Sequence, residues 1–381
     1  MVDSSTAGLR KTPLNAVHRA MGAKMVNFGG WDMPVEYPSS GGLPVEHKAV
    51  REAVGIFDVS HMGDIRICSK HVPGIALRAV QHITMNDASR LAIGQAQYSA
   101  MLYPEGTFVD DVIVHRLGED DYLLVINAGT REKDFNWVLQ KTRDFDCSVA
   151  DLSDSYTQLA IQGPRSLDLV ERLTDANLSS LGSYWFTHGE VCGLRDVMIA
   201  RTGYTGEDGF EIYVPSDRTT SETVWSMVLD AGREFGICPC GLGARNTLRL
   251  EARLSLYGHE ISESINVWEA GLGRFCKMEK GGFIGRTALE RARSAGVSRT
   301  LVGLEMVDRS IARDGYRCLS GTGEVIGAIT SGSPSPTLGK NIALAFVPPA
   351  MAALNTSVYV EIRGRAAKAR VVSTPFYKRR M

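Results

Sequence analysis

The sequence predicts an α+β protein with a β-rich C-terminal domain, and three observations support this prediction. Helical and strand-like patterns mix through the first 296 residues. From residue 297 onward, short strand-like runs are separated by Gly and Pro, and helical periodicity is scarce. Apolar residues make up 44% of the chain, which is enough for sizeable cores. We therefore divide the 381 residues into an α+β region, 1–296, and a barrel or sandwich, 297–381.

Apolar residues recur at helical spacing in three segments of the α+β region. In one of them, Phe135, Val138 and Leu139 fall on a single helical stripe. We expect helices at residues 44–54, 131–142 and 218–235.

Strand-like runs fill much of the remaining chain. Residues 109–127 predict a hairpin, because two β-rich runs flank the turn sequence GEDD. Two further strands are expected at 196–203 and 209–215, on either side of a Gly-rich turn. In the C-terminal domain we expect strands at residues 301–306, 324–332, 341–347, 357–364 and 367–374.

Composition and patterning exclude several functional classes. Lys and Arg number 42 and Asp and Glu number 43, so the basic excess of a nucleic-acid-binding protein is absent. No run of about 18 apolar residues predicts a membrane span, and the N-terminus lacks the apolar stretch of a secretory signal. The seven cysteines are scattered and odd in number, which indicates reduced thiols. We expect a cytoplasmic protein, or a mitochondrial matrix protein if a eukaryotic transit peptide has been removed.

Two adjacent carboxylates, Asp110 and Asp111, begin the first strand of the predicted hairpin. Strand alternation places Asp111 on the face of Val109 and Ile113, and Asp110 on the opposite face, which is also apolar. A carboxylate near a core needs hydrogen bonds or a cationic partner, or its pKa rises. A solvated pair at a strand end is the alternative, and the pattern alone favours it.

The segment RTGYTGEDGFEIYVP, residues 201–215, has the richest local pattern. Its glycines permit tight turns and close backbone approach. In the strand that follows, Glu211 points away from the apolar face of Phe210, Ile212 and Val214. The pattern alone favours a solvated strand face. The functional hypothesis is a carboxylate over a pocket that accepts two parallel N–H groups, as a pterin or guanine edge presents them.

Residues 240–258 are typical of a Gly-rich loop that begins a helix. Arg245, Arg249 and Arg253 recur every four residues, and a solvated helix face is the commoner explanation of such a row. Arg245 falls in the first turn, where its charge opposes the helix dipole, so an anionic ligand would explain its presence. The single CxC of Cys238 and Cys240 has no second pair, and we expect no metal site.

Eight sequence blocks, taken in chain order, resemble one family. They are TPLNAVHRAMGAKMVNFGGWDMPVEY, FDVSHMG, QYSAMLYPEGTFVDDVIV, NAGTREKDFNW, AIQGP, RTGYTGEDGFEIYVP, GLGARNTLRLEARLSLYG and TSGSPSPTLGKNIALAFV. Together they resemble the aminomethyltransferases, the T-proteins of the glycine cleavage system. The resemblance extends from Thr12 to Tyr377.

The resemblance implies three small domains around a central folate cavity: two interleaved subdomains within residues 1–296 and a barrel-like domain at 297–381. It implies transfer of an aminomethyl carbon from the lipoyl arm of H-protein to tetrahydrofolate. The products would be ammonia, methylenetetrahydrofolate and dihydrolipoyl H-protein. It also implies a monomer that uses no metal and has no nucleic-acid or membrane partner.

The matched blocks carry the family's site residues onto this sequence. The resemblance implies that Asp111 is the catalytic aspartate of the pterin pocket, which positions and polarises the attacking ring nitrogen. It implies that Glu211 grips the pterin edge and that Arg245 anchors a folate carboxylate. The other positions that match the pocket are Tyr204, Tyr98, Asn127 and Met62.

The sequence departs from the family pattern in three places. Asn246 replaces the aspartate that usually follows the arginine, Arg274 and Phe275 stand where a tryptophan is common, and the tail near Arg380 is short. Two alternative functions remain: a folate-dependent demethylase of the same superfamily, and a non-catalytic folate-binding protein that assists iron–sulfur assembly. The two carboxylates and the full C-terminal domain favour catalysis.

Overall fold

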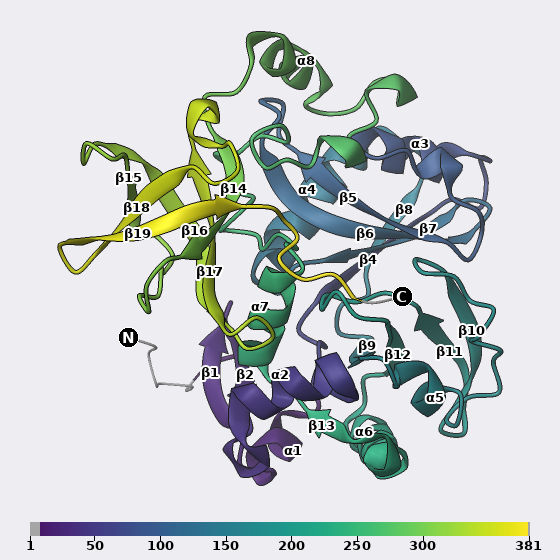
Figure 1. Ribbon diagram of the computed structural model, residues 1–381. Helices are drawn as coiled ribbons and strands as arrows, with labels where there is room; N and C mark the ends of the chain where they lie inside the picture. The colour runs from purple at the N-terminus through teal and green to yellow at the C-terminus, as the bar shows by residue number, and fades with distance from the viewer. Residues whose placement is uncertain (1–7, 380–381) are drawn as a thin grey trace. The chain divides into compact units, whose positions relative to one another are not determined.

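The computed structural model describes residues 8–379, which form a mixed α/β fold with a β-rich C-terminal domain (Figure 1). The described chain contains a two-stranded hairpin, a five-stranded sheet, a six-stranded sheet and a closed barrel. The predicted fold class is therefore confirmed, and the C-terminal domain is a barrel rather than a sandwich. The helices are α1 (Asn15–Ala20), α2 (Gly42–Glu52), α3 (Ile75–Ile83), α4 (Arg131–Thr142), α5 (Ser166–Val170), α6 (Arg218–Gly232), α7 (Leu242–Glu251) and α8 (Arg286–Ala295).

The six-stranded sheet has the order β10-β11-β12-β9-β3-β13. One of its faces packs on α6, where Trp225, Val224 and Val228 join an apolar core with Phe210 and Ile212. Each strand contributes alternate residues to this core, because successive side chains point to opposite faces. The strands are β10 (Phe186–Val191), β11 (Leu194–Ala200), β12 (Gly209–Pro215), β9 (Tyr156–Gln162), β3 (Val54–Asp58) and β13 (Ile237–Pro239).

The five-stranded sheet, in the order β5-β6-β7-β4-β8, packs on the other face of the six-stranded sheet. Leu123 and Val125 of β7 contact a cluster that includes Met198, Ala200 and Tyr213. We call this contact zone the inter-sheet layer. The strands are β5 (Ala96–Leu102), β6 (Phe108–Gly118), β7 (Asp121–Ile126), β4 (Gly63–Cys68) and β8 (Ser148–Asp151), and the two-stranded hairpin is β1 (Lys24–Phe28) with β2 (Trp31–Glu36).

The C-terminal barrel closes in the order β14-β17-β16-β15-β18-β19, with β19 pairing back onto β14. Small and branched apolar side chains from alternate positions fill its interior, which is therefore a packed core. The strands are β14 (Thr300–Met306), β15 (Arg317–Leu319), β16 (Val325–Ser335), β17 (Lys340–Val347), β18 (Ser357–Ile362) and β19 (Arg365–Val372).

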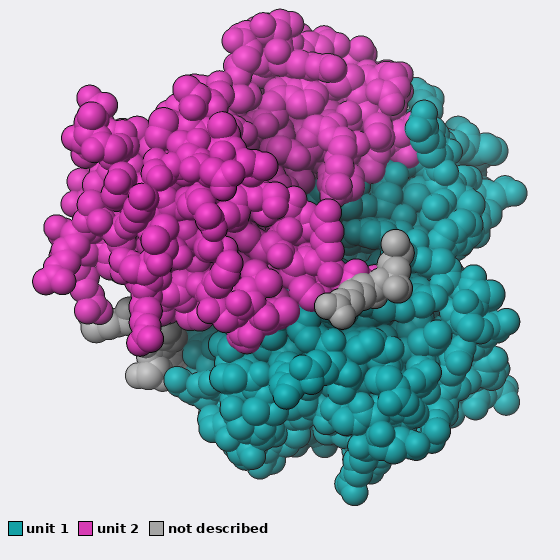
Figure 2. Space-filling view, in the orientation of Figure 1, with its two compact units in different colours: residues 1–80, 88–98, 112–246 teal, residues 81–87, 99–111, 247–381 magenta. Residues whose placement is uncertain are grey.

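The chain divides into two compact units, shown in different colours in Figure 2. The first unit contains residues 1–80, 88–98 and 112–246, and the second contains 81–87, 99–111 and 247–381. The boundaries fall inside α3, β5, β6 and α7, so single elements run from one unit into the other. The barrel lies wholly in the second unit and begins at Thr300, whereas the division of the chain at residue 297 stays a prediction.

The elements expected from periodicity are present. The three predicted helices correspond to α2, α4 and α6, and the predicted hairpin corresponds to β6 and β7. All five C-terminal strands occur, together with the short β15 that was not expected. Hydrophobic spacing was sufficient to predict these helices and strands because each of them packs one face against a core.

A buried polar network holds the N-terminal segment to β3. The Asp58 carboxylate accepts hydrogen bonds from the hydroxyls of Thr12 and Ser60, both at 2.6 Å, and contacts Nε2 of His18 at 2.9 Å. The other ring nitrogen of His18 lies 2.9 Å from the Tyr37 hydroxyl. Burial alone would raise the pKa of Asp58, but these partners outweigh it and lower the pKa to about 2. Asp58 is therefore a carboxylate that its neighbours fully satisfy.

In the second unit, a buried ion pair ties the end of α7 to the barrel. Nη1 of Arg249 lies 2.9 Å from the carboxylate of Glu260, which also accepts from the Thr330 hydroxyl of β16 at 2.6 Å. Arg249 is 2% exposed, so the solvated arginine face expected from sequence is wrong. Arg253 is not on the helix at all, because α7 ends at Glu251 and Arg253 has a left-handed φ of 57°.

We expect Glu260→Ala to lower the free energy of unfolding by about 3–5 kcal/mol, because it leaves the buried Arg249 guanidinium without the carboxylate that balances its charge. Chemical denaturation followed by circular dichroism measures the loss. Arg218→Ala, which breaks the exposed pair of Arg218 and Glu222, is the matched control and should cost less than about 1 kcal/mol. Equal costs for the two variants would contradict a supporting role for the buried pair.

Candidate functional site

The candidate site lies in the first unit, where the loop 201–208 joins β11 to β12 and Glu211 follows on β12. Two ion pairs secure this loop. Arg201 binds Asp208 with two hydrogen bonds, at 3.0 and 2.5 Å, and so joins the two ends of the loop. Arg51, which belongs to α2, donates to the Thr205 carbonyl and to the Glu207 carboxylate, both at 2.8 Å. These contacts therefore tie the two ends of the loop to each other and its middle to α2.

The Gln162 side chain occupies the space inside this loop. Its amide nitrogen donates to the Thr202 carbonyl at 3.0 Å, and its amide oxygen accepts from the Thr205 hydroxyl at 2.9 Å. A Cβ atom on Gly203 would lie 2.0 Å from Oε1 of Gln162, and one on Gly209 would lie 2.4 Å from its Nε2. Glycine is required at both positions because the buried amide leaves no room for a side chain.

Glu211 stands on the face of β12 that borders the inter-sheet layer. Its two partners in register are Ala200 on β11 and Ala160 on β9, so small side chains flank it on both sides. The Thr202 hydroxyl donates a short hydrogen bond to the Glu211 carboxylate. Burial raises the pKa of Glu211, while Thr202 and Arg245 oppose the rise. The side chain is half-buried and faces a second sheet, so the solvated strand face expected from the pattern is not its environment.

Arg245 lies in the first turn of α7, as the sequence predicted, and its guanidinium lies 4.7 Å from the centre of the Tyr204 ring. The cation therefore contacts an aromatic face. It also stabilises the charged form of Glu211. These three side chains come from different elements and combine an anion, a cation and an aromatic ring in one unit, a set that suits a planar polar ligand.

Three further polar side chains lie in the same unit and were not predicted as site residues. His61 is 1% exposed, stacks edge-on against Phe28, and has its pKa lowered to about 3 by burial and by the charge of Arg245. Arg131 contacts the Trp31 ring and bonds Asp154 at 2.7 Å. Asp64 is fully buried on β4. Neither burial nor these contacts are visible in local spacing, so periodicity could not identify them.

The remaining predicted residues occupy identifiable positions. Met62 packs on the inter-sheet layer, Asn127 directly follows β7, and Tyr98 lies on the first-unit part of β5; all three are half-buried. Asp111 is half-buried on β6 and belongs to the second unit, whereas Glu211 belongs to the first. The meeting of Asp111 and Glu211 over one ligand therefore stays a prediction.

Asp110, the first residue of the Asp-Asp motif, has a structural role. Asp110 is fully buried, and its carboxylate accepts a hydrogen bond from the Asp111 backbone N–H at 3.0 Å. The prediction that one carboxylate of the pair lies near a core is thus confirmed for Asp110. Asp111 keeps partial exposure, which a group that meets a ligand requires.

Two of the three places where the sequence departs from the family pattern fall within residues 8–379. Asn246 is exposed on α7, and the Arg274 guanidinium lies over its neighbour Phe275, 4.5 Å from the ring centre. Arg380 lies outside the described residues.

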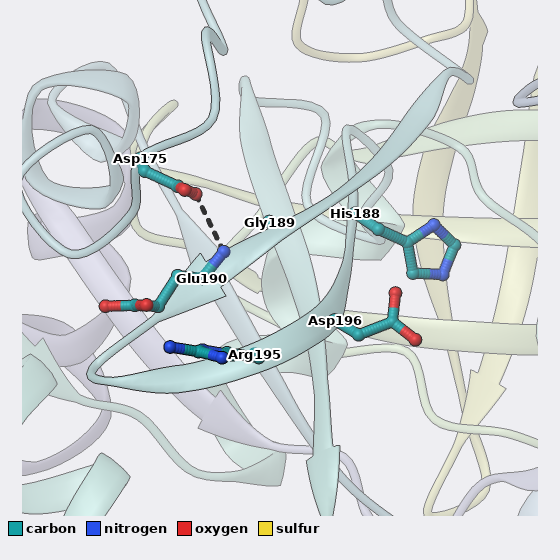
Figure 3. A pocket seen from close by; sticks show the side chains of 6 residues that line it. All are labelled: Asp175, His188, Gly189, Glu190, Arg195 and Asp196. Carbon is teal, nitrogen blue, oxygen red and sulfur yellow. Dashed lines mark hydrogen bonds between the residues drawn. The ribbon is translucent and has the colours of Figure 1, made fainter.

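A separate surface hollow lies on the hairpin of β10 and β11. Figure 3 shows its lining, in which Asp175 accepts a hydrogen bond from the backbone N–H of Glu190 at 2.7 Å and His188 lies above Asp196. None of the residues that line it was predicted as a site residue.

In the part of the chain that the structure describes, no cluster of three or more His, Cys, Asp or Glu residues is arranged to hold a metal ion. Within residues 8–379, the helices are too short or too polar to cross a bilayer.

Comparisons with known proteins agree over almost the whole chain. Residues 14–280 match the family model described as the GCVT N-terminal domain, and residues 299–378 match the glycine cleavage T-protein C-terminal barrel domain. The curated aminomethyltransferase of Koribacter versatilis is 64% identical over 373 residues, which cover 98% of this chain and 97% of that one. The aminomethyltransferase of Acidobacterium capsulatum is 62% identical over 380 residues, covering 100% and 99%.

A solved structure matches equally completely. The crystal structure of glycine cleavage system aminomethyltransferase T from Bartonella henselae is 33% identical in sequence, with a TM-score of 0.90. The match covers 98% of this chain and 99% of that one.

We expect Gly203→Ala to destabilise the protein, because the new methyl group would overlap the Gln162 amide. Combining it with Gln162→Ala should cost less than the sum of the single changes, with a favourable coupling of about 1–3 kcal/mol. A double-mutant cycle from thermal or denaturant unfolding measures this coupling. Gly282→Ala, where no atom lies within 4 Å of the added carbon, is the control. Strict additivity would show that Gln162 does not set the course of the loop.

Proposed function

Because the chain belongs to the glycine cleavage T-protein family and is an aminomethyltransferase, we propose that its donor is the lipoyl arm of H-protein and its acceptor is tetrahydrofolate. The aminomethyl carbon passes from the lipoyl sulfur to the folate. Ammonia leaves, and the products are methylenetetrahydrofolate and dihydrolipoyl H-protein. No metal is needed for this reaction, since the folate nitrogen is itself the nucleophile.

The observation that supports folate binding most directly is the environment of Glu211. A carboxylate flanked by two alanines, and fixed on one side by the Thr202 hydroxyl, can accept the paired N–H groups of a pterin edge. Two parallel charge-assisted hydrogen bonds give both affinity and orientation. The Tyr204 ring, with Arg245 over its face, offers a flat surface in the same unit.

We assign Arg245 to a carboxylate of the folate tail. Its position at the start of α7 is electrostatically unfavourable for a cation, because the helix dipole is positive at that end. A planar guanidinium suits bidentate contact with a carboxylate. Tyr98, Asn127 and Met62 are proposed to line the same cavity.

Asp111 is proposed as the catalytic aspartate. A carboxylate next to the attacking nitrogen holds it in line with the aminomethyl carbon and stabilises the cationic intermediate that forms as ammonia leaves. No covalent enzyme intermediate is required, because the nucleophile belongs to the folate. Asp111 therefore acts on the reaction rather than on binding.

Glu211→Ala should weaken tetrahydrofolate binding by about 2 kcal/mol or more, since charged hydrogen bonds to the ligand are lost. Isothermal titration calorimetry under anaerobic conditions measures the affinity. Glu222→Ala, which removes a carboxylate from α6, serves as the matched control and should bind normally. Unchanged affinity in Glu211→Ala would remove this residue from the pterin site.

Asp111→Asn should largely abolish transfer while leaving tetrahydrofolate affinity mostly intact, because it removes charge without removing volume. The test is the release of ammonia and methylenetetrahydrofolate from aminomethyl-loaded H-protein, with and without tetrahydrofolate. Release by the wild type that requires tetrahydrofolate supports the proposed function. A wild type that releases neither product would refute it, and an unchanged turnover number in Asp111→Asn would refute the role given to that residue.

A further inference from the structure

A second carboxyl group, Asp64 on β4, lies in the first unit and has no part in the reaction as derived above. It is 0% exposed. One carboxyl oxygen accepts a short hydrogen bond from the Gln158 amide, and the other, Oδ1, has no hydrogen-bond partner among residues 8–379. A buried carboxylate with a single donor is poorly stabilised, because several donors or a paired cation are needed to replace its water.

Strand register places Asp64 next to Glu211. On the face of the six-stranded sheet that borders the inter-sheet layer, Gln158 pairs with Tyr213, and Ala160 pairs with Glu211. Gln158 and Glu211 are thus diagonal neighbours, which in an antiparallel pair lie about 7–8 Å apart. Asp64 reaches this face from the opposite sheet through its hydrogen bond to Gln158.

The charged and titratable groups around Asp64 come from every element packed on it. Arg131 on α4 is the cation, Asp151 on β8 and Glu211 on β12 are carboxylates, and Tyr156 and Tyr213 are phenols. The Arg131 guanidinium already bonds Asp154 and covers the Trp31 ring. Burial is the largest influence on Asp64 and raises its pKa well above the usual value, and the two carboxylates act in the same direction.

We propose that Asp64 is held as a neutral carboxylic acid and is a positioning residue for Glu211, so that the two carboxyl groups together carry a single negative charge. Two neighbouring carboxyl groups in a low-dielectric region share one proton because ionising both is costly. Glu211 is the ionised member: it keeps partial exposure, has the Thr202 hydroxyl as donor and is attracted by Arg245. Asp64 has one amide donor and no exposure, so the proton resides there.

This assignment rests on the proposed function for its consequence, though not for its geometry. A pterin edge presents N–H donors, so only an ionised Glu211 can accept both of them. Asp64 keeps Glu211 in that form by taking the proton that the pair retains. An ionised Asp64 would instead raise the pKa of Glu211, so that Glu211 would take up a proton at a higher pH and lose one of its two acceptors.

Infrared difference spectroscopy of the full-length protein at neutral pH tests the proton directly. The wild type minus Asp64→Asn spectrum should contain the C=O stretching band of a protonated carboxylic acid. Asp144→Asn, which changes a carboxyl group that is 86% exposed, should give no such band. A wild-type spectrum without this band, or a band that survives in Asp64→Asn unchanged, would overturn the proposal.

If Asp64→Asn does not fold, the same infrared measurement can be made on wild-type protein that contains aspartate labelled with carbon-13 at the carboxyl group. The protonated band should then shift with the label, and it should shift again in Gln158→Leu, which removes the single hydrogen bond to Asp64. A protonated band that does not respond to Gln158→Leu would place the proton elsewhere and refute the assignment.

The positioning role is tested by tetrahydrofolate affinity as a function of pH. Affinity should fall by up to about tenfold per pH unit once acid protonates Glu211, and Asp64→Asn, which keeps a neutral group at this position, should fall over the same pH range as the wild type. An acid limb that moves to lower pH in Asp64→Asn would show that Asp64 is ionised in the wild type and would refute the positioning role. If the infrared band is lost in Asp64→Asn but the wild type binds no tetrahydrofolate, the proposed function fails and the protonation of Asp64 stands.

Discussion

The buried amide of Gln162 is the contact on which the arrangement of the candidate site depends. It bonds the Thr202 carbonyl and the Thr205 hydroxyl, and it excludes any side chain at Gly203 and Gly209. The loop must therefore pass close over β9 before it enters β12. Because that path fixes where Thr202 lies, it also fixes the hydroxyl that orients the Glu211 carboxylate. A hydrogen-bonded side chain in the interior thus decides the geometry of a group on the neighbouring strand.

One strand serves both packing and chemistry because β12 is covered on both faces. Phe210, Ile212 and Val214 complete the core on the side of α6. Glu211 and Tyr213 point to the inter-sheet layer on the other side. A half-solvated sheet would leave an acidic residue in water, where its pKa and orientation are unconstrained. The second sheet removes that water and gives the carboxyl groups of this layer their unusual environment.

Periodicity and glycine placement were enough to predict most elements, from the helix at 131–142 to the C-terminal strands. They also located Arg245 in a first helical turn. They failed where long-range contacts decide the outcome. The arginine row looked solvated because its spacing matches an exposed face, yet Arg249 finds Glu260 eleven residues later. Gln162 and Asp64 carry no local pattern, because their importance arises from partners on other strands.

The interleaving of the two units has a consequence for how the polypeptide can be made and altered. Since α3, β5, β6 and α7 each contribute to both units, no single cut in the gene separates them into self-sufficient pieces. During synthesis on the ribosome, the segments 81–87 and 99–111 emerge long before the residues after 246 that complete their unit. These early segments cannot pack into their unit until the later residues are synthesised. The two units are therefore expected to fold together rather than one after the other. The barrel differs in this respect, because its strands β14 to β19 follow one another in the chain without interruption.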